Sequence, residues 1–176
     1  MSKRAKQLIL ASAVPILILL GMSVLPLYTL LNGEEMILKT RPFDPSDPFR
    51  GDYVNLNYEA EQVPKELVDP AVVKKVENGS GNVTVYVLFE KRNGVHSPVR
   101  VTLNKPKSGP YLKGSLDYIS ENANQEKVAF IQYNLDKYFV EDNSGTKWEQ
   151  LSAKGELLAK AKIFNGYAYL TEITKK

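Results

Sequence analysis

The sequence predicts a mainly β protein, α+β by content: an antiparallel β-sandwich or partly open barrel with one short helix, preceded by an N-terminal transmembrane helix. Three observations predict it. An uncharged apolar run lies near the N-terminus, and later segments alternate apolar with polar residues. Two breaks between these segments are Asn-Gly pairs, at Asn93 and Asn165, which are typical of tight β-hairpins. The roughly 140 residues after the run are enough for one hydrophobic core.

The N-terminal segment predicts an uncleaved membrane anchor. Residues 1–7 form a basic tail, and residues 8–31 carry no charged side chain. A helix of about 20 apolar residues crosses a bilayer core of roughly 30 Å, so this run is long enough. The basic tail before it, against Glu34 and Glu35 after it, predicts a single-pass protein of the cell membrane with a cytoplasmic N-terminus and an extracytoplasmic β-rich domain over residues 33–176. A cleaved signal peptide is the alternative, but no small-x-small site follows the run.

The strands of the outer domain are predicted from period-two alternation. In the second of them, DYVNLNYEAE, Leu56 and Tyr58 fall on the apolar face. Residues 63–73, which contain prolines at 64 and 70, are predicted as a loop with at most a helical turn. The predicted strands cover residues 36–43, 52–61, 82–92, 98–105, 114–120, 127–134, 138–141, 157–164 and 167–173.

One soluble helix is predicted, in the stretch TKWEQLSAK. Ser144 or Thr146 is the expected N-cap, because its hydroxyl can accept a hydrogen bond from a free backbone N–H. Gly155 is the expected C-terminal stop. Trp148 and Leu151 are three residues apart, so both should face the sheet.

The stretch RPFDPSDPFRGDYVNLNYE, residues 41–59, is the most distinctive part of the sequence. Asp44 and Asp47 each precede a proline, which favours a turn. Gly51 permits backbone conformations closed to other residues. Arg50 lies among three aspartates, and a guanidinium can bridge two carboxylates with paired hydrogen bonds. These residues predict a tight corner that Arg50 staples.

Two functional interpretations of this corner stay open. Arg50, Asp52 and Tyr53 could form an exposed surface for a partner. Asp44, Asp47 and Asp52 could instead approach a calcium ion. Calcium takes six to eight oxygen ligands, and three carboxylates fall short of that number, so no metal site is predicted.

GDYVNLNYE resembles the motif that names the GDYXXLXY protein family of bacteria. The matching residues are Gly51, Asp52, Tyr53, Leu56 and Tyr58. The preceding DPSDPFR resembles the family's lead-in to this motif. A second family element resembles YFVE, which contains Tyr138, Phe139 and Glu141. The resemblance implies a membrane-anchored protein that accompanies a multi-pass membrane protein, and it implies no reaction.

A signal-peptidase-like serine/lysine hydrolase is the alternative to a binding protein. FRGDYVNL is similar to a strand opening of type I signal peptidases, which also have an N-terminal anchor and a β-rich outer domain. Their chemistry needs a serine nucleophile just outside the membrane and a lysine of lowered pKa. Ser23 lies inside the apolar run, Ser46 lacks the flanking pattern, and nothing marks Lys91 as a base. The nucleophile motif is therefore missing.

The amino-acid composition excludes several kinds of functional site. The chain has no cysteine, which excludes disulfides and thiolate sites, and its single histidine, His96, excludes a multi-histidine zinc site. His96 follows a turn and is expected in solvent or at a strand start. The outer segment carries 20 basic and 20 acidic residues, which argues against nucleic acid. We expect a non-enzymatic binding or assembly module without a cofactor, which supports or recognises an envelope or integral-membrane protein through tyrosine-rich surfaces.

Overall fold

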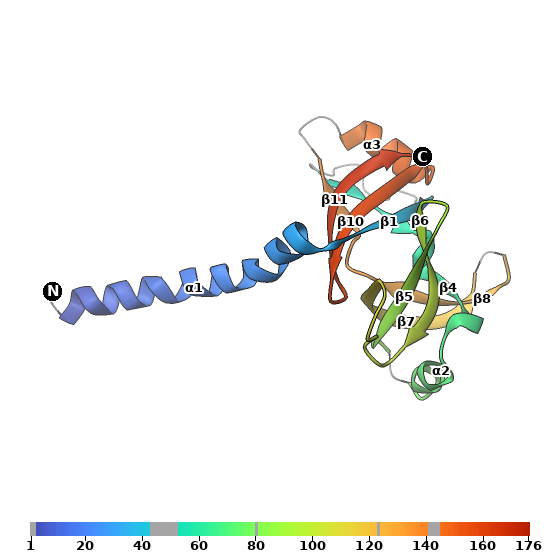
Figure 1. Ribbon diagram of the computed structural model, residues 1–176, viewed down its shortest axis with the longest axis horizontal. Coiled ribbons are helices and arrows are strands. Elements are labelled where there is room, and N and C mark those ends of the chain that lie inside the picture. The colour runs from blue at the N-terminus through green and yellow to red at the C-terminus, as the bar shows by residue number, and fades with distance from the viewer. Residues whose placement is uncertain (1–2, 43–52, 80, 123, 141–144) are drawn as a thin grey trace.

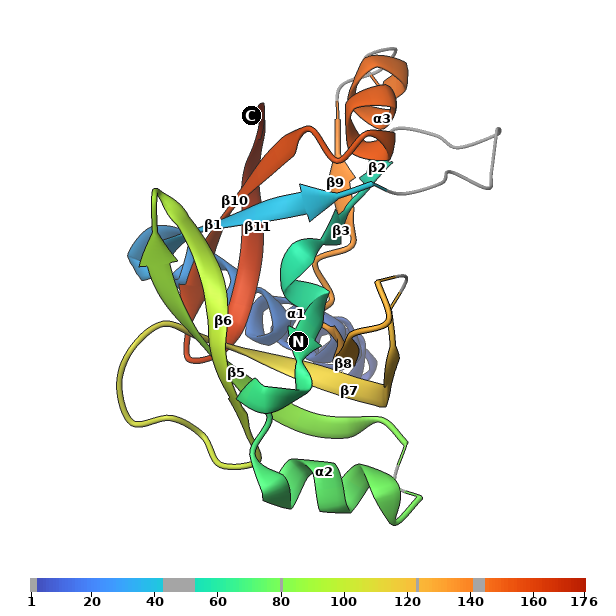
Figure 2. The same ribbon diagram turned by 90° about the vertical axis from the view of Figure 1, so that its right-hand side faces the viewer.

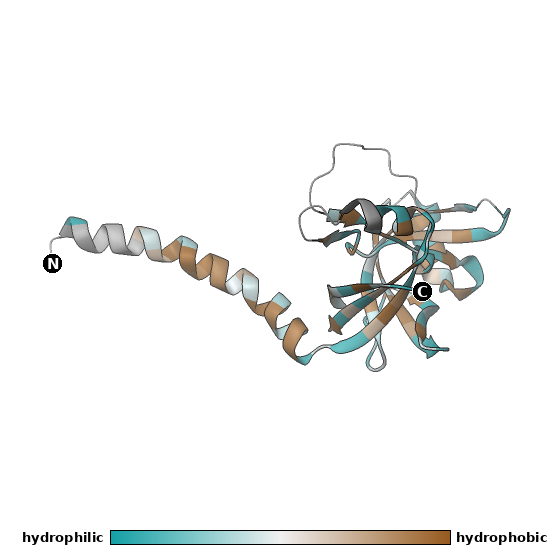
Figure 3. Cartoon of the chain, turned by 90° about the horizontal axis from the view of Figure 1, so that it is seen from above, coloured by the Kyte–Doolittle hydropathy of each residue, from teal (hydrophilic) through white to brown (hydrophobic). Residues whose placement is uncertain are grey.

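A long helix and a β domain make up the chain, and the computed structural model describes residues 3–42, 53–79, 81–122, 124–140 and 145–176 (Figure 1). Helix α1 (Lys3–Asn32) projects from the domain. Its segment Ala11–Asn32 is long and apolar enough to cross a membrane, and little of it packs against the domain. Colouring by hydropathy shows apolar turns along this helix and mixed strands in the domain (Figure 3).

The domain consists mainly of short antiparallel strands. Their bounds are β1 (Glu34–Arg41), β2 (Tyr53–Asn55), β3 (Asn57–Tyr58), β4 (Gln62–Pro64), β5 (Val83–Arg92), β6 (Val95–Thr102), β7 (Tyr111–Glu121), β8 (Lys127–Gln132), β9 (Lys137–Phe139), β10 (Leu157–Phe164) and β11 (Tyr167–Lys175). Helices α2 (Pro70–Glu77) and α3 (Gly145–Ala153) and the 3-10 turns η1 (Glu59–Glu61) and η2 (Lys65–Leu67) connect them. One sheet has the order β11-β10-β1-β3, another has the order β4-β8-β7-β5-β6, and β2 pairs with β9.

The sheets curl around one core as a half-barrel, which confirms the predicted mainly β fold (Figures 1 and 2). The inward faces match the alternation in the sequence. Val85 and Val87 of β5 are fully buried, as are Leu56 and Tyr58. Both Asn-Gly turns are confirmed, because Asn93 and Asn165, with the glycines that follow them, adopt the positive φ angles of tight hairpin turns.

The prediction of a loop over residues 63–73 was wrong. That segment contains β4, η2 and the start of α2. Pro70 occupies the first turn of α2, where its missing N–H would have no helical partner anyway. Val72 is fully buried and seats this helix on the core. The side chain of Asp69 binds Arg100, with its oxygens 2.8 and 3.0 Å from the guanidinium nitrogens, and does not cap the helix.

The predicted strand over residues 52–61 is not continuous. It divides into β2, β3 and η1, and the chain changes partner strands at Leu56. Helix α3 is confirmed, with Trp148 and Leu151 packed against the core and Gly155 just beyond its end. Ser144 lies outside the described residues, and the side chain of Thr146 is not described, so the N-cap stays a prediction.

His96 lies at a strand start, which is one of the two positions expected for it, and it is not in solvent. Only 7% of the residue is exposed. Its Nδ1 accepts a hydrogen bond from the backbone N–H of Ile37, at 3.0 Å, and so joins β6 to β1. Burial lowers the pKa of His96, which keeps the imidazole neutral for this role. The histidine is a structural link between the two larger sheets.

Candidate functional site

Part of the sequence-predicted site lies outside the described residues. The residues concerned are Asp44, Asp47, Arg50, Gly51, Asp52 and Glu141. The stapled corner and its two functional interpretations therefore stay predictions. Among the residues that are described, no group of three or more histidine, aspartate or glutamate side chains is placed to hold a metal ion.

The two stretches that resemble family elements lie side by side. Strand β2 pairs with β9, so that Tyr53 lies opposite Phe139 and Val54 opposite Tyr138. The rings of Tyr53 and Phe139 meet edge to face with centroids 6.1 Å apart. The ammonium of Lys137 lies 5.3 Å from the centre of the Tyr53 ring, within the range of a cation–π contact. The fold thus brings Tyr53 and Val54 of the first family element beside Tyr138 and Phe139 of the second.

Beyond Tyr53, the motif turns inward and joins the sheet that contains β1. The backbone N–H of Leu56 donates to the carbonyl of Asp136 at 2.8 Å, and Tyr58 then pairs with Thr40 of β1. The Tyr58 hydroxyl donates to the carbonyl of Leu135 at 2.7 Å. Burial, reinforced by two nearby carboxylates, holds the pKa of Tyr58 well above its usual value. Leu56 and Tyr58 are therefore core residues that fix the path of the chain.

A polar cleft opens directly beside this crossing, and Arg41 and Glu61 face each other within it. Glu61 accepts the backbone N–H of Tyr58 at 3.1 Å, which turns its carboxylate back toward β3. The same oxygen lies 3.9 Å from Nη2 of Arg41. The cleft has a volume of about 380 Å³. We call it the Arg41–Glu61 cleft; its wall also includes Asn57, Asp117, Tyr118, Phe130 and Asp136.

The electrostatics of the cleft are unusual for a surface feature. Burial raises the pKa of Glu61 to about 7, and the Asp136 charge adds to the rise, while the Tyr58 N–H and Arg41 oppose it. Nε of Arg41 is buried and has no hydrogen-bond partner among the described residues. A buried donor without a partner costs about 1–3 kcal/mol.

The side of the cleft formed by β7 and β8 is aromatic. Tyr118 and Phe130 stack with centroids 4.6 Å apart and an interplanar angle of 30°. Tyr118 remains 52% exposed. The cleft therefore offers an open ring face beside carboxylates, amides and one guanidinium. This combination can hold a ligand through stacking and hydrogen bonds together.

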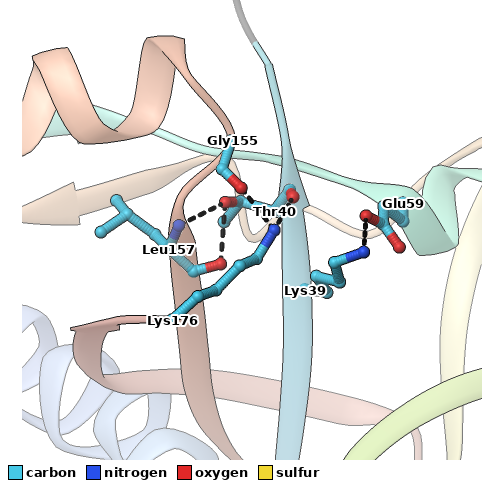
Figure 4. Close-up of polar contacts among 6 residues, drawn as sticks. All are labelled: Lys39, Thr40, Glu59, Gly155, Leu157 and Lys176. Atoms are coloured by element: carbon cyan, nitrogen blue, oxygen red, sulfur yellow. Dashed lines mark hydrogen bonds and ion pairs between the residues drawn. The ribbon is translucent and has the colours of Figure 1, made fainter.

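The β1 wall of the cleft is firmly held by the residues before Arg41 (Figure 4). The Thr40 hydroxyl donates to the carbonyl of Leu157 at 2.8 Å and accepts the N–H of the same residue at 3.1 Å. The carbonyl of Thr40 also accepts a hydrogen bond from Nζ of Lys176 at 3.0 Å. Lys39 forms an exposed ion pair with Glu59 at 2.5 Å. Arg41 thus extends from an ordered strand end.

The residues proposed for a serine/lysine hydrolase do not meet at this cleft. The Ser23 hydroxyl lies in α1 and donates to the carbonyl of Leu19 at 2.9 Å. Lys91 is exposed beside the first Asn-Gly turn. Ser46 lies outside the described residues. None of the residues that line the cleft in the described part of the chain is a serine, lysine or histidine.

Sequence reasoning missed Arg41 and Glu61. One local signal was available, because Glu61 follows Tyr58 by three residues and its carboxylate binds the N–H of Tyr58, as in a capping arrangement. Asp117, Tyr118 and Asp136 come from segments far along the chain, and only the fold brings them together.

One comparison with known proteins gives a match. A family model described as GDYXXLXY protein matches residues 15–173, which is nearly the whole chain. No curated protein and no solved structure matches.

Proposed function

The chain belongs to the GDYXXLXY protein family, and we propose that it is a membrane-anchored binding or assembly module that recognises an envelope or integral-membrane protein. In this proposal residues 8–31 hold the chain in the cell membrane, and residues 33–176 lie on the extracytoplasmic side. The length and apolar composition of α1 support the anchor. The basic tail before it supports the orientation. The module is non-enzymatic.

The observation that carries the proposal is the Arg41–Glu61 cleft. A partner that offers a hydrogen-bond acceptor would bind the accessible part of the Arg41 guanidinium, whose side chain is 33% exposed, and a donor would satisfy the Glu61 carboxyl. A planar or apolar group beside them would cover the exposed ring of Tyr118. The backbone of a protein segment supplies acceptors and donors side by side. A segment with an apolar side chain would add the third contact, so a protein partner fits the cleft.

Binding suits the cleft better than catalysis. The raised pKa of Glu61 has a structural cause, since its carboxylate holds the backbone of Tyr58 from a buried position. Perturbed pKa values also occur in structural networks, and among the described residues the cleft is lined by no serine, lysine or histidine. The described lining offers carboxylates and amides, which are recognition groups.

Site-specific photocrosslinking in intact membranes would test this proposal. A photoreactive phenylalanine analogue would replace Tyr118 in the cleft. In the matched control it would replace Arg92, which lies on the exposed β5–β6 turn with 68% of its side chain accessible. We expect a discrete adduct with a membrane or envelope protein from position 118, and none from position 92.

Arg41→Gln, introduced beside the label at position 118, should abolish the adduct without changing Trp148 fluorescence. Arg92→Gln is the matched control for charge removal and should leave the adduct intact. An absent adduct at position 118, or one that persists in a folded Arg41→Gln variant, would overturn the proposal. The same assay with Arg50→Ala and Asp52→Ala tests whether the predicted corner contributes to the interface.

A further inference from the structure

Helix α1 enters the β domain without a spacer. The backbone N–H of Gly33 donates to the carbonyl of Thr29 at 2.8 Å, and Thr29 is fully buried by the domain. A Cβ atom at Gly33 would lie 2.9 Å from the carbonyl oxygen of Ile163, so only glycine fits this approach. The end of α1 is thus packed directly on β10, and the direction of the helix fixes the direction of the domain.

Aromatic rings continue this junction on the outside. Tyr28 of α1 and Phe164 at the end of β10 meet edge to face with centroids 4.7 Å apart. The turn after Phe164 is held in place, because the Tyr111 hydroxyl donates to Oδ1 of Asn165 at 3.0 Å and Lys113 N–H donates to the Gly166 carbonyl at 2.9 Å. The β10–β11 turn cannot move away from the helix without breaking these bonds.

More aromatic residues surround the end of the helix. A groove of about 470 Å³ runs from Leu30 of α1 along β9 and β11. Tyr167 lines it, as do Phe139, which is 75% exposed, and Tyr169, which is 43% exposed. Figure 1 shows β11 and its turn on the side of the domain that faces α1. We call the four residues Phe139, Phe164, Tyr167 and Tyr169 the aromatic collar.

The length of the helix places this collar relative to a membrane. The 22 residues Ala11–Asn32 span about 33 Å at 1.5 Å per residue, close to the roughly 30 Å of a bilayer core. Asn32 then marks the outer boundary of the core, and Tyr28 lies about 6 Å inside it. A side chain that contacts Tyr28 must therefore lie at or below the headgroup layer. Tyrosine is enriched at this depth in membrane proteins.

We propose that the aromatic collar lies in the lipid headgroup layer and seats the β domain on the bilayer in one orientation. The proposal rests on the membrane anchor proposed above and adds a second lipid contact, made by β9, β10 and β11. Electrostatic attraction contributes little to this lipid contact. Lys105 and Lys107 line the cavity beside Phe164 and Lys137 lines the groove, while Glu34 lines the same cavity and Glu35 follows it in the chain, so the net charge beside the collar is small.

Depth-dependent fluorescence quenching would test the proposal on the full chain. The chain has no cysteine, so a single introduced cysteine takes one environment-sensitive fluorophore. Tyr169→Cys and Phe139→Cys label the collar at two exposed positions. Lys74→Cys labels α2, which lies away from α1, and Val24→Cys labels the anchor (Figures 1 and 2). The protein would be reconstituted into vesicles of phosphatidylcholine and phosphatidylglycerol with spin-labelled lipids.

We expect headgroup spin labels to quench positions 139 and 169 several-fold more than position 74, and acyl-chain labels to quench position 24. Equal weak quenching at positions 139, 169 and 74, with position 24 still quenched, would overturn the collar while the anchor stands. Such a result would point to a protein on this surface. An unquenched position 24 would overturn the anchor and the collar together.

Discussion

Glu61→Gln should make the β domain less sensitive to pH between pH 5 and 8. Burial raises the pKa of Glu61 from 4.5 to about 7, so the folded protein retains a proton that the unfolded chain has already released. Each pKa unit corresponds to about 1.4 kcal/mol, which sets the maximum effect of this carboxyl at about 3 kcal/mol.

The sign of the effect follows from the fact that Glu61 binds its proton more tightly in the folded protein than in the unfolded chain. Stability from Glu61 is fully present below pH 4.5, and it is lost as the pH rises through 7. Glutamine does not titrate. Relative to wild type, the Gln variant should therefore gain about 3 kcal/mol in unfolding free energy between pH 4.5 and pH 8. The lowered pKa of His96 acts in the opposite direction, but it is common to both proteins and cancels in the difference.

Urea unfolding of the full chain in a nonionic detergent would measure this difference, with fluorescence of the single tryptophan, Trp148, as the probe. Trp148 packs against the core, so it reports on unfolding of the domain. Glu66→Gln, at an exposed position on η2, is the matched control and should follow wild type at every pH. A difference between wild type and Glu61→Gln that stays constant from pH 5 to 8 would refute the burial argument.

Three further substitutions test the junction and the core. Tyr58→Phe should lower the unfolding free energy by about 1–3 kcal/mol, because the buried carbonyl of Leu135 loses its donor; an unchanged urea midpoint would contradict this. Thr40→Val keeps the shape but removes two hydrogen bonds to Leu157, so a loss of about 1–3 kcal/mol is expected and a neutral result would be evidence against it. Gly33→Ala should force α1 off the domain and expose the junction to limited proteolysis, while the urea midpoint changes little; a junction as resistant as wild type would argue against close packing.

Much of the fold could be predicted from the sequence, because alternation reports which face of a strand is buried. It could not report which strand is the partner. Val54, Leu56 and Tyr58 all point into the core at alternate positions, so the stretch resembles a single strand in the sequence. In the structure its partner strand changes from β9 to β1 between Val54 and Tyr58. Helix α2 was missed for another reason. A proline usually indicates the boundary of a loop, yet Pro70 stands at a helix start, where it costs no hydrogen bond.

The candidate site could be predicted only in part. The motif lies directly beside the Arg41–Glu61 cleft, because Glu61 follows Tyr58 by three residues and binds its backbone N–H. Its chemistry depends on burial and on neighbours from distant segments. The pKa of Glu61 rises because the domain folds over it, and nothing in the order of residues indicates that Tyr118 and Phe130 face it. The role of His96 was missed likewise, since its partner Ile37 lies in a strand of the other large sheet.

The residues of the motif and the residues of the cleft should have separable effects. Leu56 and Tyr58 are fully buried, so no ligand can reach them, and their substitution acts on binding only through the fold. Arg41 and Tyr118 reach the surface of the cleft, so their substitution can remove binding from a domain that stays folded. Under the proposed function, Leu56 and Tyr58 support a binding site that Arg41 and Tyr118 form. Loss of binding in a folded Arg41 variant, beside loss of both folding and binding in a Tyr58 variant, would separate these two roles.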